Sequence, residues 1–140
     1  MKVLIIDNND SFSYNLKHYI EHHSAAVTVI RGDRLDLDYI HEFNKVILSP
    51  GPGLPSEHPV LLQVLDRFVG KKSILGICLG HQAIAEYFGA TLSNLENVKH
   101  GLSSSLTHFS NCILYNNLPS SFNVGHYHSW VVSKNSIPKD

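Results

Sequence analysis

The sequence contains little cysteine, no excess of charge of either sign and no long apolar run. Its two cysteines, Cys78 and Cys112, are too few for the disulfide framework of a small secreted protein. The 11 basic and 12 acidic side chains argue against a nucleic acid or a membrane surface held by bulk charge. The first apolar run, residues 3–6, ends at Asp7, so neither a signal peptide nor a membrane span is visible. We therefore expect a cytoplasmic protein without nucleic-acid or membrane partners.

Strands and helices alternate along the chain as far as Gly89. Short apolar runs at 3–6, 26–30, 45–48 and 73–77 predict strands. Helical spacing predicts helices near 12–20, 35–43, 60–68 and 82–88, and Asp10 or Ser11 can cap the first of them. This order predicts an α/β fold, a mostly parallel sheet with helices on both faces. Beyond Gly89 we expect short extended pieces, such as 113–115 and 130–132.

Three polar or glycine-rich loops follow predicted strands, at residues 7–11, 49–55 and 78–82. Ligands of parallel sheets bind beyond the carboxyl ends of the strands. We therefore expect the functional site where these three loops meet.

The third loop has the pattern of a nucleophile elbow. The segment Gly76-Ile77-Cys78-Leu79-Gly80 places one thiol between two glycines where a strand turns into a helix. Small neighbours are needed there because the nucleophile adopts a strained backbone conformation. The helix start behind the sulfur is expected to favour the thiolate, which is the attacking species. The alternative is a buried cysteine that serves as a small hydrophobic residue.

Attack by a thiolate on an amide carbon creates an oxyanion, which needs two fixed hydrogen-bond donors. The main-chain N–H of Leu79 can supply one of them. The Gly51-Pro52-Gly53 segment is the candidate for the second, because glycine allows close approach to the backbone and proline stiffens the loop. Taken alone, this segment is an ordinary turn.

The histidines do not indicate a metal site. His81 lies within the predicted helix after the elbow, where a packing or helix-end role is favoured over catalysis. The pairs His22-His23 and His126/His128 lack a Cys, Asp or Glu ligand at a recognisable spacing. We expect neither a metal nor another cofactor.

Five segments occur in the order seen in class I glutamine amidotransferases, and the chain resembles this family over nearly its whole length. The first two segments are most similar to those of the glutaminase subunit, component II, of anthranilate synthase or aminodeoxychorismate synthase. The choice between these two synthases stays open. The resemblance implies a flavodoxin-like fold. The segments are Asp7-Asn8-Asn9-Asp10-Ser11-Phe12, Ser49-Pro50-Gly51-Pro52-Gly53, Gly76-Ile77-Cys78-Leu79-Gly80-His81-Gln82, His100-Gly101 and Tyr127-His128-Ser129.

The resemblance implies a glutaminase in which Cys78 attacks the side-chain amide of L-glutamine and water clears the resulting thioester. By motif position, the N–H groups of Gly53 and Leu79 would hold the oxyanion. The ammonia would pass to a chorismate-binding synthase subunit, component I, as partner in a hetero-oligomer. The residues implied in glutamine binding are Gly51, Pro52, Gly53, Gln82, Ser129 and Trp130.

One part of the family pattern is missing from these residues. The family's catalytic base is a histidine followed closely by a glutamate, downstream of the Tyr127-His128-Ser129 segment, and no His-x-Glu follows Cys78 here. A triad works as a unit, so losing the base removes most of the rate. We therefore expect residues 1–140 to form a single, incomplete domain of this family, lacking the C-terminal part of the fold, with little or no glutaminase activity alone.

Two other functions stay open on the sequence. One is a catalytically inactive binding or regulatory subunit of the same synthase. The other is a hydrolase or stress protein of the wider flavodoxin-like group, although such proteins tend to place histidine directly after the cysteine, where this chain has Leu79.

Overall fold

The computed structural model describes residues 1–23, 25–108 and 113–138. The chain divides into two compact units. The first contains residues 1–92 and the segment from 132 onward, and the second contains residues 93–131. The expectation of one domain over residues 1–140 stays a prediction, and Cys112 lies outside the described residues.

The first unit is built on a four-stranded parallel sheet in the order β2-β1-β3-β4. All four strands match the apolar runs of the sequence, because a strand covered on both faces needs continuous apolar residues. The register aligns Ile6 of β1 with Leu48 of β3, and Leu48 with Gly76 of β4, so the carboxyl ends of these strands lie together. The strands are β1 (Lys2–Asp7), β2 (Ala26–Arg31), β3 (Lys45–Leu48) and β4 (Ser73–Gly76).

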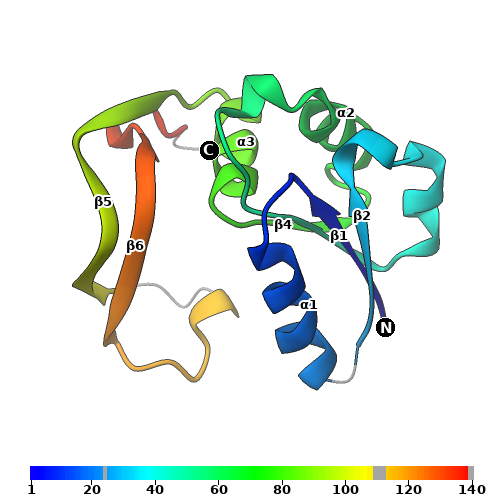
Figure 1. Ribbon diagram of the computed structural model, residues 1–140, viewed down its shortest axis with the longest axis horizontal. Helices are drawn as coiled ribbons and strands as arrows, with labels where there is room; N and C mark the ends of the chain where they lie inside the picture. Colours follow the sequence, from blue (N-terminus) through cyan, green and yellow to red (C-terminus); the bar gives the residue numbers. More distant parts are fainter. Residues whose placement is uncertain (24, 109–112, 139–140) are drawn as a thin grey trace. The chain divides into compact units, whose positions relative to one another are not determined.

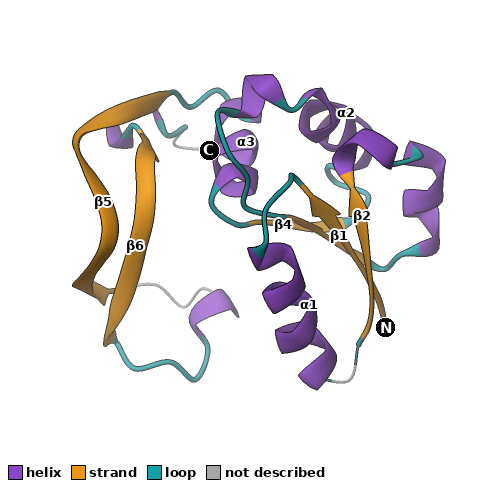
Figure 2. Ribbon diagram, in the orientation of Figure 1, coloured by secondary structure: helices purple, strands orange, loops and turns teal. Residues whose placement is uncertain are grey.

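Three α-helices cover the two faces of this sheet, as the alternating pattern predicts (Figures 1 and 2). They are α1 (Phe12–His22), α2 (Pro59–Phe68) and α3 (Leu79–Tyr87). On one face, Leu4 and Leu48 pack with side chains of α2 and α3. On the other face, Ile5 and Ile47 pack with Leu16 of α1. Burial of these apolar side chains is the main term that holds helices and sheet together.

The cap of α1 comes from Asp10. The main-chain N–H of Phe12 donates a hydrogen bond to Asp10 Oδ1 at 2.8 Å. Ser11 occupies the position before the helix but makes no side-chain capping bond. Of the two capping residues predicted from the sequence, Asp10 is therefore the one whose side chain accepts a hydrogen bond from a main-chain N–H in the first turn of α1.

Two predicted segments adopt a different conformation. Within the helix expected over 35–43, the structure has a short 3-10 helix, η2 (Leu37–Glu42), and a separate 3-10 turn, η1 (Gly32–Arg34), precedes it. The side chain of Asp36 accepts a hydrogen bond from Asp38 N–H at 2.9 Å, and Tyr39 N–H donates to Asp36 O, which favours the tighter turn. Residues 113–115, expected to be extended, form the 3-10 turn η4 (Ile113–Tyr115), closed by a bond from Asn116 N–H to Ile113 O. The remaining 3-10 turns are η3 (Pro55–Glu57) and η5 (Lys134–Ser136).

The second unit is based on two long strands, β5 (Leu92–Thr107) and β6 (Ser121–Val132), which form a two-stranded sheet. The expectation of only short extended pieces is therefore wrong for these segments. Polar cross-strand pairs accompany the pairing: Ser104 Oγ lies 2.6 Å from His126 Nε2, and Ser105 Oγ lies 3.0 Å from Ser121 Oγ. The polar strand β5 carries little of the apolar periodicity from which long strands are predicted, whereas Phe122 and Val124 alternate with exposed residues at the start of β6.

Candidate active site

Cys78 occupies the turn between β4 and α3 in a strained conformation. Its backbone angles are φ 52° and ψ -108°, and a positive φ is unusual for a residue with a side chain. The residue is exposed. These two features match the elbow predicted from the sequence and contradict the alternative of a buried structural cysteine.

Both glycines of the elbow are needed because other backbone passes next to them. A Cβ on Gly76 would overlap the carbonyl group of Gly80, and a Cβ on Gly80 would overlap the carbonyl oxygen of Leu48 at the end of β3. The start of α3 can therefore lie directly against the sheet. Glycine is thus needed at both positions of the G-x-C-x-G segment because α3 packs closely against the sheet, and not only because of the tight turn at Cys78.

The three segments named from the sequence meet at the carboxyl edge of the sheet, although α3 begins at Leu79, so residues 79–82 are the start of this helix and not a loop. A Cβ built on Gly51 would lie 2.6 Å from Leu79 Cδ2 and 2.7 Å from Asn8 Cβ. Gly51 therefore lies against both the 7–11 loop and the start of α3. This contact confirms that these segments, far apart in the sequence, lie together at one edge of the sheet.

The 49–55 loop is tied to the 3-10 turn that follows it. Gly53 has φ 73°, and the main-chain N–H of Leu54 donates to Glu57 Oε1 at 2.8 Å. His58 Nε2 lies 2.8 Å from the carbonyl oxygen of Pro52. A loop held in this way keeps its main-chain groups in fixed positions, as a binding site for a developing charge requires.

Burial raises the pKa of Cys78 above that of an ordinary thiol. The main-chain N–H of Leu79 at the start of α3 acts in the opposite direction, and the negative charge of Asp10 adds to the rise. The expectation that the helix start makes the thiolate the favoured form is therefore wrong for the folded chain. One N–H group lowers the pKa, but desolvation of the sulfur outweighs it.

The residues implied in glutamine binding are divided between the two units. Gln82 is buried on α3, one turn after Cys78, and its main-chain N–H bonds to Cys78 O at 3.0 Å. Ser129 and Trp130 are half-buried in β6 of the second unit, and their contact with a substrate stays a prediction.

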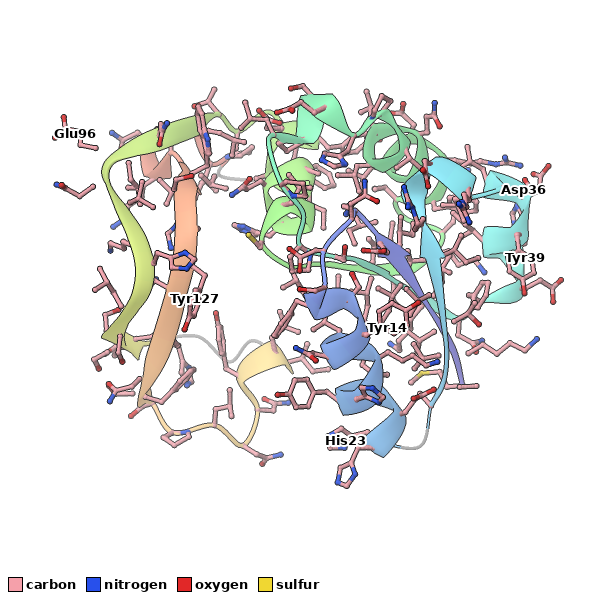
Figure 3. The ribbon with its side chains drawn as sticks, in the orientation of Figure 1. Tyr14, His23, Asp36, Tyr39, Glu96 and Tyr127 are labelled. Atoms are coloured by element: carbon pink, nitrogen blue, oxygen red, sulfur yellow. The ribbon has the colours of Figure 1, made fainter. Side chains whose placement is uncertain are left out.

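The Tyr127-His128-Ser129 segment lies in β6 as well. Tyr127 is 67% exposed (labelled in Figure 3). His126 and His128 are half-buried, and a ring nitrogen of one lies 3.2 Å from a ring nitrogen of the other.

Two buried polar residues at this edge received no role from the sequence. Asn8 is 2% exposed and Ser49 is fully buried, and they are joined by hydrogen bonds between the ends of β1 and β3. Their position in the sequence could have indicated a role, because each is the first residue after a strand and ligands bind beyond the carboxyl ends of the strands. The pairing itself crosses 41 residues, so no local pattern specifies it.

Over residues 1–23, 25–108 and 113–138, no group of three or more His, Cys, Asp or Glu residues is placed to hold a metal ion. His81 is exposed on α3. In the same described part of the chain, no helix is long and apolar enough to cross a membrane.

Comparison with known proteins identifies the family of this site. The model of the family "Glutamine amidotransferase class-I" matches residues 4–140. The chain belongs to the class I glutamine amidotransferase family.

Two relatives of this amidotransferase carry the names of component II proteins. It is 43% identical over 138 residues to a protein provisionally named anthranilate synthase component II from Haemophilus influenzae, covering 99% of this chain and 72% of the relative. It is 40% identical over 138 residues to aminodeoxychorismate synthase component 2 from Escherichia coli, covering 97% of this chain and 73% of the relative.

A solved structure supports the fold of the amidotransferase. A protein from Thermoplasma acidophilum, provisionally described as part of a GMP synthase, superposes with a TM-score of 0.86 at 22% identity. The match covers 100% of this chain and 69% of that protein. The parallel sheet with helices on both faces is therefore the fold of this group.

Proposed function

We propose that this amidotransferase is the glutaminase subunit of a chorismate-aminating synthase and that Cys78 is its nucleophile. The observation that carries the proposal is the strained, exposed Cys78 at the start of α3, where this helix meets the 7–11 and 49–55 loops. An enzyme that forms a covalent intermediate needs a nucleophile raised beside main-chain donors.

In the proposed reaction the Cys78 sulfur attacks the side-chain carbonyl carbon of L-glutamine, forming a C–S bond and a tetrahedral oxyanion. The N–H groups of Gly53 and Leu79 stabilise that charge. The intermediate then collapses, the C–N bond breaks, and ammonia leaves with a proton derived from the thiol. Water next attacks the thioester and breaks the C–S bond, which yields glutamate and regenerates the thiol. The sum is glutamine plus water giving glutamate plus ammonia.

The remaining site residues hold the amino-acid end of glutamine. Gln82 lies one turn after Cys78 on α3, and Gly51 of the 49–55 loop lies against Leu79 at the start of the same helix, with Pro52 next to it in the chain. Ser129 and Trp130 of β6 are proposed as further contacts of glutamine by motif position alone. Polar groups of this kind orient a substrate while the covalent chemistry occurs at the sulfur.

The proposed partner is a chorismate-binding synthase subunit, component I, which receives the ammonia. Relatives with the names of both anthranilate synthase and aminodeoxychorismate synthase components support this class of partner. Their similar identities favour neither pathway over the other.

These residues contain no His-x-Glu after Cys78, so the proposal assigns no general base among them. We expect the 140-residue chain to bind a glutamine analogue and react with it once, but to release little or no glutamate. An inactive binding subunit of the same synthase would not react with the glutamine analogue at all.

The test is covalent labelling of Cys78 by a diazoketone analogue of glutamine, read by intact mass. The sulfur first adds to the ketone carbon, which gives a tetrahedral oxyanion at the position of the glutamine oxygen. The thiol proton is transferred to the diazo carbon, and the sulfur then moves to that carbon as N2 leaves and the ketone is restored. We expect stoichiometric labelling that glutamine slows and that Cys78→Ser abolishes. Labelling no faster than that of a free thiol, or labelling unaffected by glutamine, would contradict the proposed function. Glutamate release abolished by Cys78→Ser would show that the expectation of inactivity is wrong.

A further inference from the structure

Asn8 connects the end of β1 to the beginning of the 49–55 loop through three hydrogen bonds. Its main-chain N–H donates to Ser49 Oγ at 2.9 Å, and its side-chain Nδ2 donates to Ser49 O at 3.0 Å and to Ser49 Oγ at 3.4 Å. Ser49 Oγ in turn donates to Pro50 O at 2.6 Å. The two strand ends and the first peptide groups of the loop are thus held as one unit.

These bonds are shielded from water, because Asn8 is 2% exposed and Ser49 is fully buried. Hydrogen bonds in such a place are costly to break, since the freed groups cannot pair with solvent. Asn8 Oδ1 is buried without a hydrogen-bond partner among the described residues. The NH2 group of the Asn8 side chain, and not its oxygen, is therefore the part that bonds to the loop.

The fixed loop leads directly to the main-chain groups of the proposed site. Gly51 packs on the Asn8 main chain, where a Cβ would lie 2.8 Å from Asn8 O. The downstream end of the loop is held by Glu57 and His58. Gly53 lies between these two attachments, so its N–H direction depends on both.

We propose that Asn8 is a positioning residue of the glutaminase site, whose side-chain amide holds the 49–55 loop so that the Gly53 N–H points at the developing oxyanion. The inference rests on the proposed function. Complete loss of an oxyanion donor costs about 10²- to 10³-fold in rate. A displaced donor should cost less, about tenfold.

The test replaces the donor without changing the size of the side chain. In Asn8→Asp, a carboxylate oxygen faces Ser49 O and repels it. We expect the maximal rate of labelling by the diazoketone analogue to fall about tenfold at neutral pH, with little change in the analogue concentration at half-maximal rate. The rate with iodoacetamide, which needs no oxyanion donor, should stay within about twofold of wild type.

Asn44→Asp is the matched control. Asn44 lies at the opposite edge of the same sheet, and its Oδ1 accepts a bond from Lys2 N–H at 2.7 Å. A carboxylate still accepts that bond, so the same chemical change should leave both labelling rates at the wild-type value.

A pH profile separates positioning from a general loss of structure. As the pH falls, the carboxyl group in Asn8→Asp becomes protonated and can donate to Ser49 O, and burial makes this occur above the ordinary pKa of an aspartate. We expect the deficit relative to wild type to shrink toward acidic pH. A variant that is merely destabilised would show a constant or growing deficit.

Ser49→Ala gives a second test that does not depend on how well Asn8→Asp folds. It removes the acceptor of the Asn8 N–H and should also slow analogue labelling while sparing the reaction with iodoacetamide. Normal analogue labelling in both variants, or equal losses with both reagents, would overturn the role of Asn8. Absence of glutamine-dependent labelling in the wild-type chain would instead overturn the proposed function, and this inference with it.

Discussion

Cys78 combines a conformation suited to attack with a thiol that resists ionisation. Its strained backbone exposes the residue, while burial of the sulfur raises its pKa and the nearby negative charge of Asp10 raises it further. Since only the thiolate reacts, alkylation of Cys78 should increase with pH through a midpoint above that of an ordinary thiol. A general base would therefore be needed for fast turnover near neutrality.

Removing the charge of Asp10 should make Cys78 more reactive. Because that charge disfavours the thiolate, Asp10→Asn should lower the pKa of Cys78. We expect iodoacetamide to react faster than with wild type at neutral pH, by about twofold or more, since the thiolate is the reacting form. The asparagine oxygen can still accept the Phe12 N–H bond that caps α1, so stability should change little.

Asp36→Asn is the control for this variant. Asp36 (labelled in Figure 3) caps η2 in the same manner, by accepting from Asp38 N–H, and it is not among the groups that shift the pKa of Cys78. Its alkylation profile should match wild type. An unchanged midpoint in Asp10→Asn would show that the carboxylate does not influence the sulfur.

Among the elements, α3 depends on Gly80 for its approach to β3. A Cβ there would overlap the Leu48 carbonyl oxygen, so the helix must move or the strand must shift. We expect Gly80→Ala to lower the free energy of unfolding by about 1–3 kcal/mol, measured by urea denaturation. This expected value is the net change, after the gain in helix propensity of about 1 kcal/mol that replacing glycine by alanine brings.

Gly125→Ala in β6 provides the comparison. The nearest atom to its added Cβ is Tyr127 Cε2 at 3.4 Å, an ordinary contact, so the change should stay within about 0.5 kcal/mol. If Gly80→Ala were as stable as wild type, the close contact between α3 and β3 would not be a requirement of the fold.

At the scale of the whole molecule, the proposed function requires a complex. Ammonia released at Cys78 would otherwise be lost to water, so a glutaminase subunit should bind the enzyme that uses its product. We expect this chain to co-elute with the chorismate-binding synthase subunit of the same organism in size-exclusion chromatography. Cys78→Ser should bind equally well, because the serine keeps the size of the side chain.

A mixture that elutes as two separate proteins would contradict the partner proposal. If the complex forms but Cys78 is not labelled by the glutamine analogue, the inactive binding subunit becomes the better description. The two measurements thus separate the proposed functions at the level of the assembly.

Local patterns in the sequence were enough to predict the parallel strands, the helices on both faces of the sheet and the elbow at Cys78. These features are local, because short apolar runs, helical spacing and the two glycines around a cysteine act over a few residues. The segments 35–43 and 113–115 were harder to predict, since a few side-chain and main-chain bonds decide between a 3-10 turn and another conformation.

The raised pKa of Cys78 and the bonds on which the proposed role of Asn8 rests depend on contacts between distant segments of the chain. The helix start favours the thiolate locally, but burial by surrounding elements outweighs it and reverses the expected direction of the pKa. The bonds from Asn8 to Ser49 join residues 41 apart, at the ends of strands that are brought together by sheet pairing. Desolvation and long-range contacts are properties of the packed chain, so no segment of the sequence carries them alone.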